Sequence, residues 1–412
     1  MAGLSDISSR REFIKTATAS GAALTLAGCT GESTGSSSSE TITIGLLQPF
    51  TGEVGWVGES SEVAVEIAID EINNAGGING NTVEIVAEDT EAGQQTATSA
   101  IRKLINSDGA STILGPTSFT LPAVMGIAQD NQVPIISPTA GTSELDDVGG
   151  EYIFRTASSD SLGGRAMARI AEQNGYEEIA VMYVDNQGGR SFGKTVVEGF
   201  EALGGTVTTE VAVTPGKNSY RSELTKAFED SPEFVSLTAG AETGSIILNQ
   251  WNEQGLGGVW GLSDDMQTNG FASEMGDIIE GSYAIGPLSG GDRYEEFASE
   301  YESRAGESPR PFTAEGYDAM ILAALAAEAA GSSNPAELAE QIISVSQDGE
   351  AVESFQQGSN AIENGADINY QGASGPVDFT ENGNIRSPFA VVQSNGDSWE
   401  QTGRIEPDQL EF

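Results

Sequence analysis

The feature that most constrains the fold is an alternation of short β-branched runs with amphipathic helical segments, which begins at Thr41. Residues 41–47 predict a strand, and apolar residues at helical spacing follow until an Asn/Gly-rich stop at 73–77. The series continues with strands expected at 82–87, 111–114 and 133–136 and with helices expected at 96–105 and 120–130. Strands that alternate with helices in this way form a parallel sheet covered on both faces.

A second series of the same kind begins after Phe154-Arg155. Its expected strands are 179–184, 206–213, 234–238 and 258–262, and its expected helices are 192–203, 221–228 and 244–254. An Ala-rich helix at 313–330 and a helix from Pro335 follow without a third series, so we expect them to return to the first lobe. The sequence therefore predicts an α/β protein with two doubly wound parallel-sheet lobes, and 412 residues are long enough for two domains.

The charge is strongly acidic. There are 18 Lys and Arg residues against 62 Asp and Glu residues, a formal net charge of −44. The 38% of hydrophobic residues fall in periodic blocks, which indicates a folded core with an acidic surface rather than disorder. Such a surface excludes nucleic acid as a natural partner, because phosphate binding needs basic residues. Since only five residues are Lys, and salt screens carboxylate repulsion, the composition indicates a halophile of haloarchaeal type.

Two residue types limit the possible chemistry. The absence of His removes the commonest general base and transition-metal ligand, so we expect no enzyme activity, no metal and no cofactor. A single Cys, Cys29, allows neither an internal disulfide nor a Cys-cluster metal site.

The N-terminus has the pattern of an export signal. Arg10-Arg11 precedes a weakly apolar stretch that ends in Leu-Ala-Gly-Cys at 26–29, so the pair resembles a twin-arginine signal and the tetrapeptide resembles a lipobox. The alternative, a transmembrane anchor, needs a longer apolar run of about 20 residues. We expect a signal peptide at 1–28, a lipid-modified Cys29, and a Ser-rich tether over 29–40 that holds the protein at the outer face of the membrane.

Three loops follow predicted strands at the edge where open parallel sheets bind ligands. They are the Gly-Pro-Thr-Ser-Phe-Thr run at 115–120, the Ser-Pro loop at 137–145 and the Ser-Asp-Asp run at 263–265. Free N–H groups in the first loop offer an anion site, the second loop offers hydroxyls and backbone groups, and the third places carboxylates at the lip of the other sheet. Each loop has an ordinary alternative reading, as a helix cap or as solvated surface.

The chain resembles the leucine/isoleucine/valine-binding protein family of ABC transporters over the whole mature length. The resemblance is carried by Ile44 to Gly52, Asp70 to Gly80, Ile113 to Pro116, Pro134 to Pro138 and Glu315 to Ala319. It implies the type I periplasmic-binding fold, with two lobes joined by three crossovers near 154–158, 284–288 and 373–377. On this basis lobe 1 is expected to comprise 41–155 plus 286–374, and lobe 2 to comprise 156–285 plus 375–412.

The same resemblance implies the ligand-binding residues. Ser118, Thr139 and the Gly141-Thr142 step would hold the carboxylate and part of the ammonium, and Asp264 or Asp265 would complete the ammonium site. The expected aromatic walls are Trp56, Phe119, Phe192 and Phe312, of which Phe119 and Phe192 could equally be core residues. The chain departs from the family pattern where Gly141 replaces a Thr, where Phe192 replaces a Tyr, and where 239–241 are small.

These features favour a non-catalytic capture protein for a branched-chain amino acid or similar zwitterion, monomeric and docking on membrane permease subunits. An amide such as urea and a small carboxylate also fit. A sensory ectodomain shares the fold, but no transmembrane segment precedes the end at Phe412. An exported hydrolase with Ser118 as nucleophile would lack a base.

The acidic composition predicts that folding requires salt. Because a net charge of −44 repels itself, circular dichroism over a sodium or potassium chloride series should show loss of structure at low salt. A spectrum that is unchanged at low millimolar salt would contradict the prediction.

Overall fold

The computed structural model describes residues 40–52, 54–288 and 290–412. The predicted signal peptide, Cys29 and most of the tether lie outside the described residues, so the export and lipidation predictions stay predictions.

The first sheet has the strand order β2-β1-β3-β4-β5, and all of its strand pairs are parallel. The sequence predicted four of its five strands. The fifth, β5, follows Tyr152 and was not predicted, because Phe154-Arg155 was taken as the boundary between the two series. The bounds are β1 Thr41–Gln48, β2 Thr82–Asp89, β3 Thr112–Leu114, β4 Ile135–Ser137 and β5 Ile153–Arg155.

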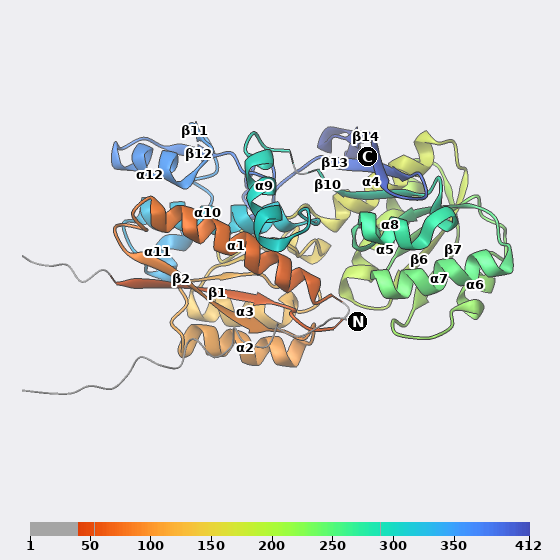
Figure 1. Cartoon of the computed structure of the whole chain (residues 1–412), viewed down its shortest axis with the longest axis horizontal. Helices are drawn as coiled ribbons and strands as arrows, with labels where there is room; N and C mark the ends of the chain where they lie inside the picture. Colours follow the sequence, from red (N-terminus) through yellow and green to blue (C-terminus); the bar gives the residue numbers. More distant parts are fainter. Residues whose placement is uncertain (1–39, 53, 289) are drawn as a thin grey trace, which may run out of the picture. The chain divides into compact units, whose positions relative to one another are not determined.

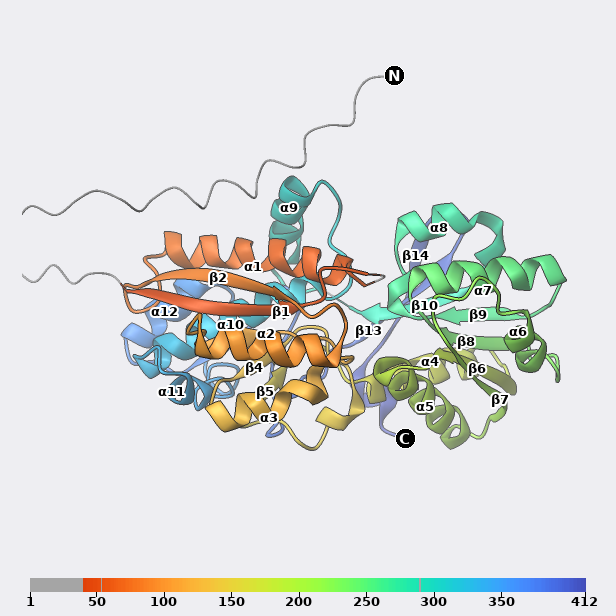
Figure 2. The ribbon, with the colours of Figure 1, turned by 90° about the horizontal axis from the view of Figure 1, so that it is seen from below.

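Helices cover both faces of this sheet (Figures 1 and 2). Alternate residues of β1 point to opposite faces, so Ile44 and Leu46 join one apolar cluster and Leu47 joins another. The first cluster includes α1 (Trp56–Asn74) and α10 (Thr313–Ala330), and the second includes α2 (Gln94–Asn106) and α3 (Leu121–Asn131). This confirms the expected return of the Ala-rich helix to the first sheet.

The second sheet has the order β14-β13-β10-β9-β8-β6-β7. Strands β6 to β10 run parallel, and β13 pairs antiparallel with both β10 and β14 at one edge, so the predicted second lobe has a mostly parallel sheet. A tight turn at 395–398 joins β13 to β14, and only antiparallel strands can be joined so closely. The bounds are β6 Glu178–Val184, β7 Thr206–Val213, β8 Phe234–Thr238, β9 Val259–Leu262, β10 Tyr283–Pro287, β13 Phe389–Ser394 and β14 Trp399–Ile405.

This sheet is also covered on both faces. One apolar cluster includes residues of α4 (Asp160–Gln173) and α5 (Gln187–Ala202), and the other includes residues of α6 (Arg221–Ala227), α7 (Ala241–Gln254) and α8 (Asn269–Met275). We call the parts built on the five-stranded and seven-stranded sheets the first and second lobes. The remaining elements are α9 (Tyr294–Ala305), α11 (Pro335–Ala339), β11 (Glu350–Val352), α12 (Phe355–Glu363), β12 (Ile368–Tyr370) and the short 3-10 turns Ser143–Leu145, Asp264–Met266, Gly276–Ile279 and Pro407–Leu410.

The chain passes between the two sheets three times, as the fold class predicted: after β5, after β10 and between β12 and β13. Helix α10 holds the first and third passages. The Thr156 hydroxyl donates to the backbone carbonyl of Glu315 at 2.9 Å. The buried Asp318 carboxylate accepts from the Ala373 and Ser374 amides at 2.8 Å each, from the Ser374 hydroxyl at 2.5 Å and from the Tyr370 hydroxyl at 2.8 Å.

The Asp318→Ala variant should lose about 3 to 5 kcal/mol of unfolding free energy, because it leaves two buried backbone N–H groups without an acceptor. Ser374→Ala removes a single hydroxyl donor and should cost about 1 kcal/mol. Urea denaturation at fixed high salt measures both. A loss in Asp318→Ala no larger than that in Ser374→Ala would show that the carboxylate does not anchor the passage.

Candidate ligand-binding site

A cavity of about 580 Å³ lies where the loops at the carboxyl ends of the strands of both sheets meet. The first lobe lines it with the loops after β1, β3 and β4, and the second lobe with the loops after β6, β8 and β9. This is the edge at which open parallel sheets present backbone N–H groups and helix N-termini. The sequence-predicted residues on its wall are Trp56, Ser118, Phe119, Thr139, Gly141, Phe192, Asp264, Asp265 and Phe312.

Thr142 is the predicted residue that does not line the cavity. It is buried, and its N–H donates to the Ser118 hydroxyl oxygen at 3.1 Å, while its own hydroxyl accepts from Gln187 of the second lobe at 3.4 Å. The Ser118 hydroxyl proton is therefore directed away from Thr142 and can be donated to a ligand. The neighbouring Ser143 N–H also reaches the second lobe and donates to the Ser191 hydroxyl at 3.0 Å.

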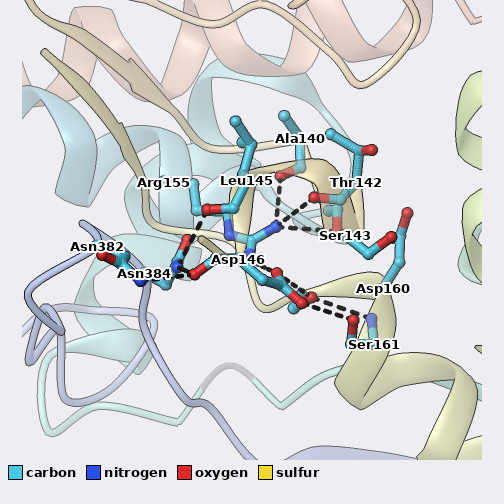
Figure 3. A network of polar contacts seen from close by, with 12 residues as sticks. Ala140, Thr142, Ser143, Leu145, Asp146, Arg155, Asp160, Ser161, Asn382 and Asn384 are labelled. Atoms are coloured by element: carbon cyan, nitrogen blue, oxygen red, sulfur yellow. Dashed lines mark hydrogen bonds and ion pairs between the residues drawn. The ribbon is translucent and has the colours of Figure 1, made fainter. Parts of the chain in front are cut away.

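A buried arginine holds the Ser-Pro loop from behind (Figure 3). The Arg155 side chain is 1% exposed, and its Nη1 donates to the carbonyls of Gly141 at 3.0 Å and Thr142 at 2.9 Å. Its Nη2 forms an ion pair with Asp146, which also accepts from the hydroxyls of Ser159 at 2.7 Å and Ser161 at 2.6 Å. The loop that forms the cavity wall is thus tied to the start of α4.

Asp160, the first residue of α4, is a wall residue that the sequence analysis missed. Its backbone N–H donates to the Gly141 carbonyl at 2.6 Å, and its Oδ1 lies 2.2 Å from where a Cβ on Gly141 would stand. A side chain at position 141 therefore does not fit beside this carboxylate. The departure from the family pattern at Gly141 has a physical explanation: the space is given to Asp160.

Two carboxylates of the cavity have strongly shifted acidities. Burial raises the pKa of Asp160 to about 7; the negative charge of Asp264 adds to this effect, while the Ser191 hydroxyl and Arg155 oppose it. Burial raises the pKa of Asp264 to about 6, against hydrogen bonds from backbone N–H groups of its own turn. The ionised forms of both carboxylates are therefore under-compensated in the cavity.

Aromatic rings form much of the remaining wall. Trp56, Phe119, Phe192 and Phe312 all line it, and Phe389 of β13 joins them without having been predicted. Phe119 is close to the second lobe, because a Cβ on Gly188 would stand 3.4 Å from its ring. Phe312 has φ 68°, a left-handed conformation that is uncommon for a bulky residue, directly before α10.

The sequence did contain a signal for Asp160. Ser159 is the N-cap of α4 and accepts from the Ser161 amide at 3.0 Å, a Ser-Asp start that is typical of a helix N-terminus. Neither strand β5 nor helix α4 was predicted, so Asp160 was not recognised as lying beyond the end of a strand. Phe389 had no comparable signal, since β13 reaches the cavity only through its pairing with β10.

Within the described ranges, no group of three or more acidic or Cys side chains is arranged to hold a metal ion. Among the helices of those same ranges, none is both long and apolar enough to cross a membrane.

Two α/β lobes that share a ligand-sized cavity at their strand ends and are joined by three passages define a two-lobed solute-binding protein. The chain belongs to the periplasmic binding protein family, whose sequence model matches residues 41–399. Members of this family are exported binding proteins rather than enzymes.

Named relatives agree with this assignment. The chain is 26% identical to the chemotactic signal transduction system substrate-binding protein BasB of Halobacterium salinarum, over 82% of this chain and 83% of the relative. It is also 26% identical to the leucine-, isoleucine-, valine-, threonine- and alanine-binding protein of Pseudomonas aeruginosa, over 74% and 83%.

Solved structures show the same fold. The leucine-binding protein LivK of Thermotoga maritima superposes with a TM-score of 0.77 at 24% identity, covering 89% of this chain and 99% of that one. A solute-binding protein of R. palustris in complex with benzoate superposes with a TM-score of 0.75 at 19% identity, covering 89% and 97%.

The raised pKa of Asp160 predicts a pH-dependent stability in the ligand-free protein. The folded protein keeps this proton up to about pH 7, whereas an unfolded chain releases it near pH 4, so the stabilising contribution is complete below about pH 4 and is lost as the pH rises to about 7. As the pH rises through this window at constant salt, the melting temperature of Asp160→Asn should therefore increase relative to that of wild type. The exposed Asp130→Asn serves as the control and should show a constant difference. Parallel curves for wild type and Asp160→Asn would contradict the prediction.

Proposed function

We propose that this protein is the substrate-binding protein of an ABC uptake transporter and that it captures a small amino-acid-like solute. The observation that carries the proposal is that Ser118 of the first lobe and Asp264 of the second line one cavity. The hydroxyl is suited to donate to a carboxylate and the aspartate to accept from an ammonium. The amino acids named for the Pseudomonas aeruginosa relative support this ligand class.

A ligand that contacts both lobes would bind the closed form more tightly than the open form. A solute that touches only one lobe binds open and closed forms equally, whereas one held by both lobes shifts the equilibrium towards closure. The closed form would then dock on permease subunits in the membrane. From the sequence we further propose that the protein is exported, anchored through Cys29, adapted to high salt and monomeric.

Two other functions have specific support. The chemotactic relative in Halobacterium salinarum favours a sensory role, in which the closed form would signal to a receptor. The benzoate complex in R. palustris shows that this fold also accepts a carboxylate without an amine. An amide such as urea also remains a candidate from the sequence.

The ligand assignment is tested in two steps. A thermal-shift screen of amino acids, amides and organic acids at high salt identifies the solute, because a ligand stabilises the state that it binds. Calorimetric titration of Ser118→Ala, Asp264→Ala and Asp265→Ala with that solute follows. Loss of a buried charged contact should weaken binding by about 2 to 5 kcal/mol, roughly 30-fold to several-thousand-fold.

Wild-type affinity in Ser118→Ala and in both aspartate variants would place the binding site elsewhere. A solute from the amide or organic-acid group would replace the amino-acid proposal while leaving the binding function in place.

A further inference from the structure

The charged side chains on the cavity wall are predominantly acidic. Among the described residues of the wall, Arg190 is the single basic one; it forms an ion pair with Asp185 at 2.5 Å and is about half exposed. The acids are Glu91, Asp160, Asp264 and Asp265. A ligand in this cavity therefore meets more negative than positive charge, which favours cations and penalises anions.

Four backbone donors beside the cavity are already engaged. In the Ser-Pro loop, the amides of Thr139, Ala140, Thr142 and Ser143 donate to serine hydroxyls of the protein itself. The pairs are Thr139 to Ser137 at 3.3 Å, Ala140 to Ser137 at 2.9 Å, Thr142 to Ser118 at 3.1 Å and Ser143 to Ser191 at 3.0 Å. A carboxylate that binds these amides must first break existing hydrogen bonds, whereas an ammonium needs none of them.

Asp160 forms no ion pair within the part of the chain that the structure describes, and the charge of Arg155 compensates it only in part. Its Oδ2 is buried and accepts no hydrogen bond from any described residue. The nearest guanidinium, on Arg155, lies behind the loop and is shared among Asp146 and the carbonyls of residues 140–142. The negative charge of Asp264 acts on the same carboxyl group. A positive group between Asp160 and Asp264 would compensate both acids at once.

The aromatic wall suits the same kind of ligand. Faces of Trp and Phe rings attract ammonium groups as well as apolar carbon, and desolvation strengthens that attraction. Five such rings line the cavity: Trp56, Phe119, Phe192, Phe312 and Phe389.

We propose that the cavity selects organic ammonium ions, with the cationic group held between Asp160 and Asp264 and the carbon skeleton against the aromatic rings, and that the ligand needs no carboxylate. This inference rests on the proposed function and narrows its ligand class: the ammonium is the obligatory part of the solute. Gly141 is a positioning residue, because its lack of a side chain leaves room for the Asp160 carboxylate.

Matched triplets of compounds test the inference on the whole protein at constant high salt. Each triplet holds one carbon skeleton and varies the charge: leucine, 3-methylbutylamine and 4-methylpentanoate; phenylalanine, 2-phenylethylamine and 3-phenylpropanoate; glycine, methylamine and acetate. In the triplet whose skeleton fits, calorimetry should show that the amine binds within about tenfold of the amino acid or more tightly. The carboxylate of that triplet, which has no amine, should show no measurable binding.

Single-residue variants test which side chains bind the amine. Asp160→Asn and Asp264→Asn should each weaken amine binding about 30-fold or more. Gly141→Ala leaves every charge in place but displaces the Asp160 carboxylate, so a comparable loss is expected. The exposed Asp130→Asn should bind like wild type, which controls for the overall field of an acidic protein.

The pH profile supplies an independent readout. Because a proton and the ammonium compete for the same carboxylates, amine affinity should rise between about pH 5 and 8, and Asp160→Asn should flatten that rise. The charged groups that act on Asp160 are Arg155, Asp146 and Asp264, and the first two are fixed in the buried network, so the profile reports on the carboxylate pair.

The binding results distinguish failure of the ammonium inference from failure of the proposed amino-acid-binding function. Binding of an amino acid without binding of its amine would overturn this inference and leave the proposed function intact. Binding of an acid or an amide in place of every amine and amino acid would overturn both the inference and the amino-acid assignment. Absence of binding across all three triplets would count against both.

Discussion

The hydrogen bonds of Arg155 are the interaction on which the arrangement of the cavity depends. The guanidinium is buried and binds three successive carbonyls of the Ser-Pro loop together with Asp146. Asp146 in turn accepts from Ser159 and Ser161 at the start of α4, and its carbonyl accepts from Asn382 and Asn384 at 2.9 and 3.0 Å. One cation thus fixes a cavity wall, the first passage between the lobes and the segment that leads to β13 (Figure 3).

The same network determines the electrostatics of the site. With the loop held in place, the Gly141 carbonyl accepts the Asp160 amide, and the Asp160 carboxylate occupies the space that a side chain at 141 would fill. Arg155 is close enough to lower the pKa of Asp160 but is already shared among other acceptors, so burial dominates and the pKa stays raised. The result is a cavity whose described wall combines acidic side chains with aromatic rings.

The sequence predicted much of this site because of one rule about open sheets. Loops after parallel strands share an edge, which assigned the loops at 115–120, 137–145 and 263–265 to a common site, and the family resemblance then implied Ser118, Thr139 and Asp264 or Asp265 within them. Thr142 was placed on the wall but lies behind it, because its N–H donates to Ser118 in the same lobe and its hydroxyl accepts from Gln187 of the second lobe. Asp160 and Phe389 were missed because neither helix α4 nor strand β13 was predicted from the sequence.

The sequence by itself determined the α/β fold class and the acidic composition, because hydrophobic periodicity and composition are properties of the chain that do not depend on tertiary contacts. It also determined the family, through motifs that lie in order along the mature chain. Only the tertiary structure decided which carboxylates line the cavity, how Gly141 makes room for Asp160, and where β13 and β14 pair. These features depend on distances between residues far apart in the chain, and burial rather than residue type sets the charge state of the acids that meet there.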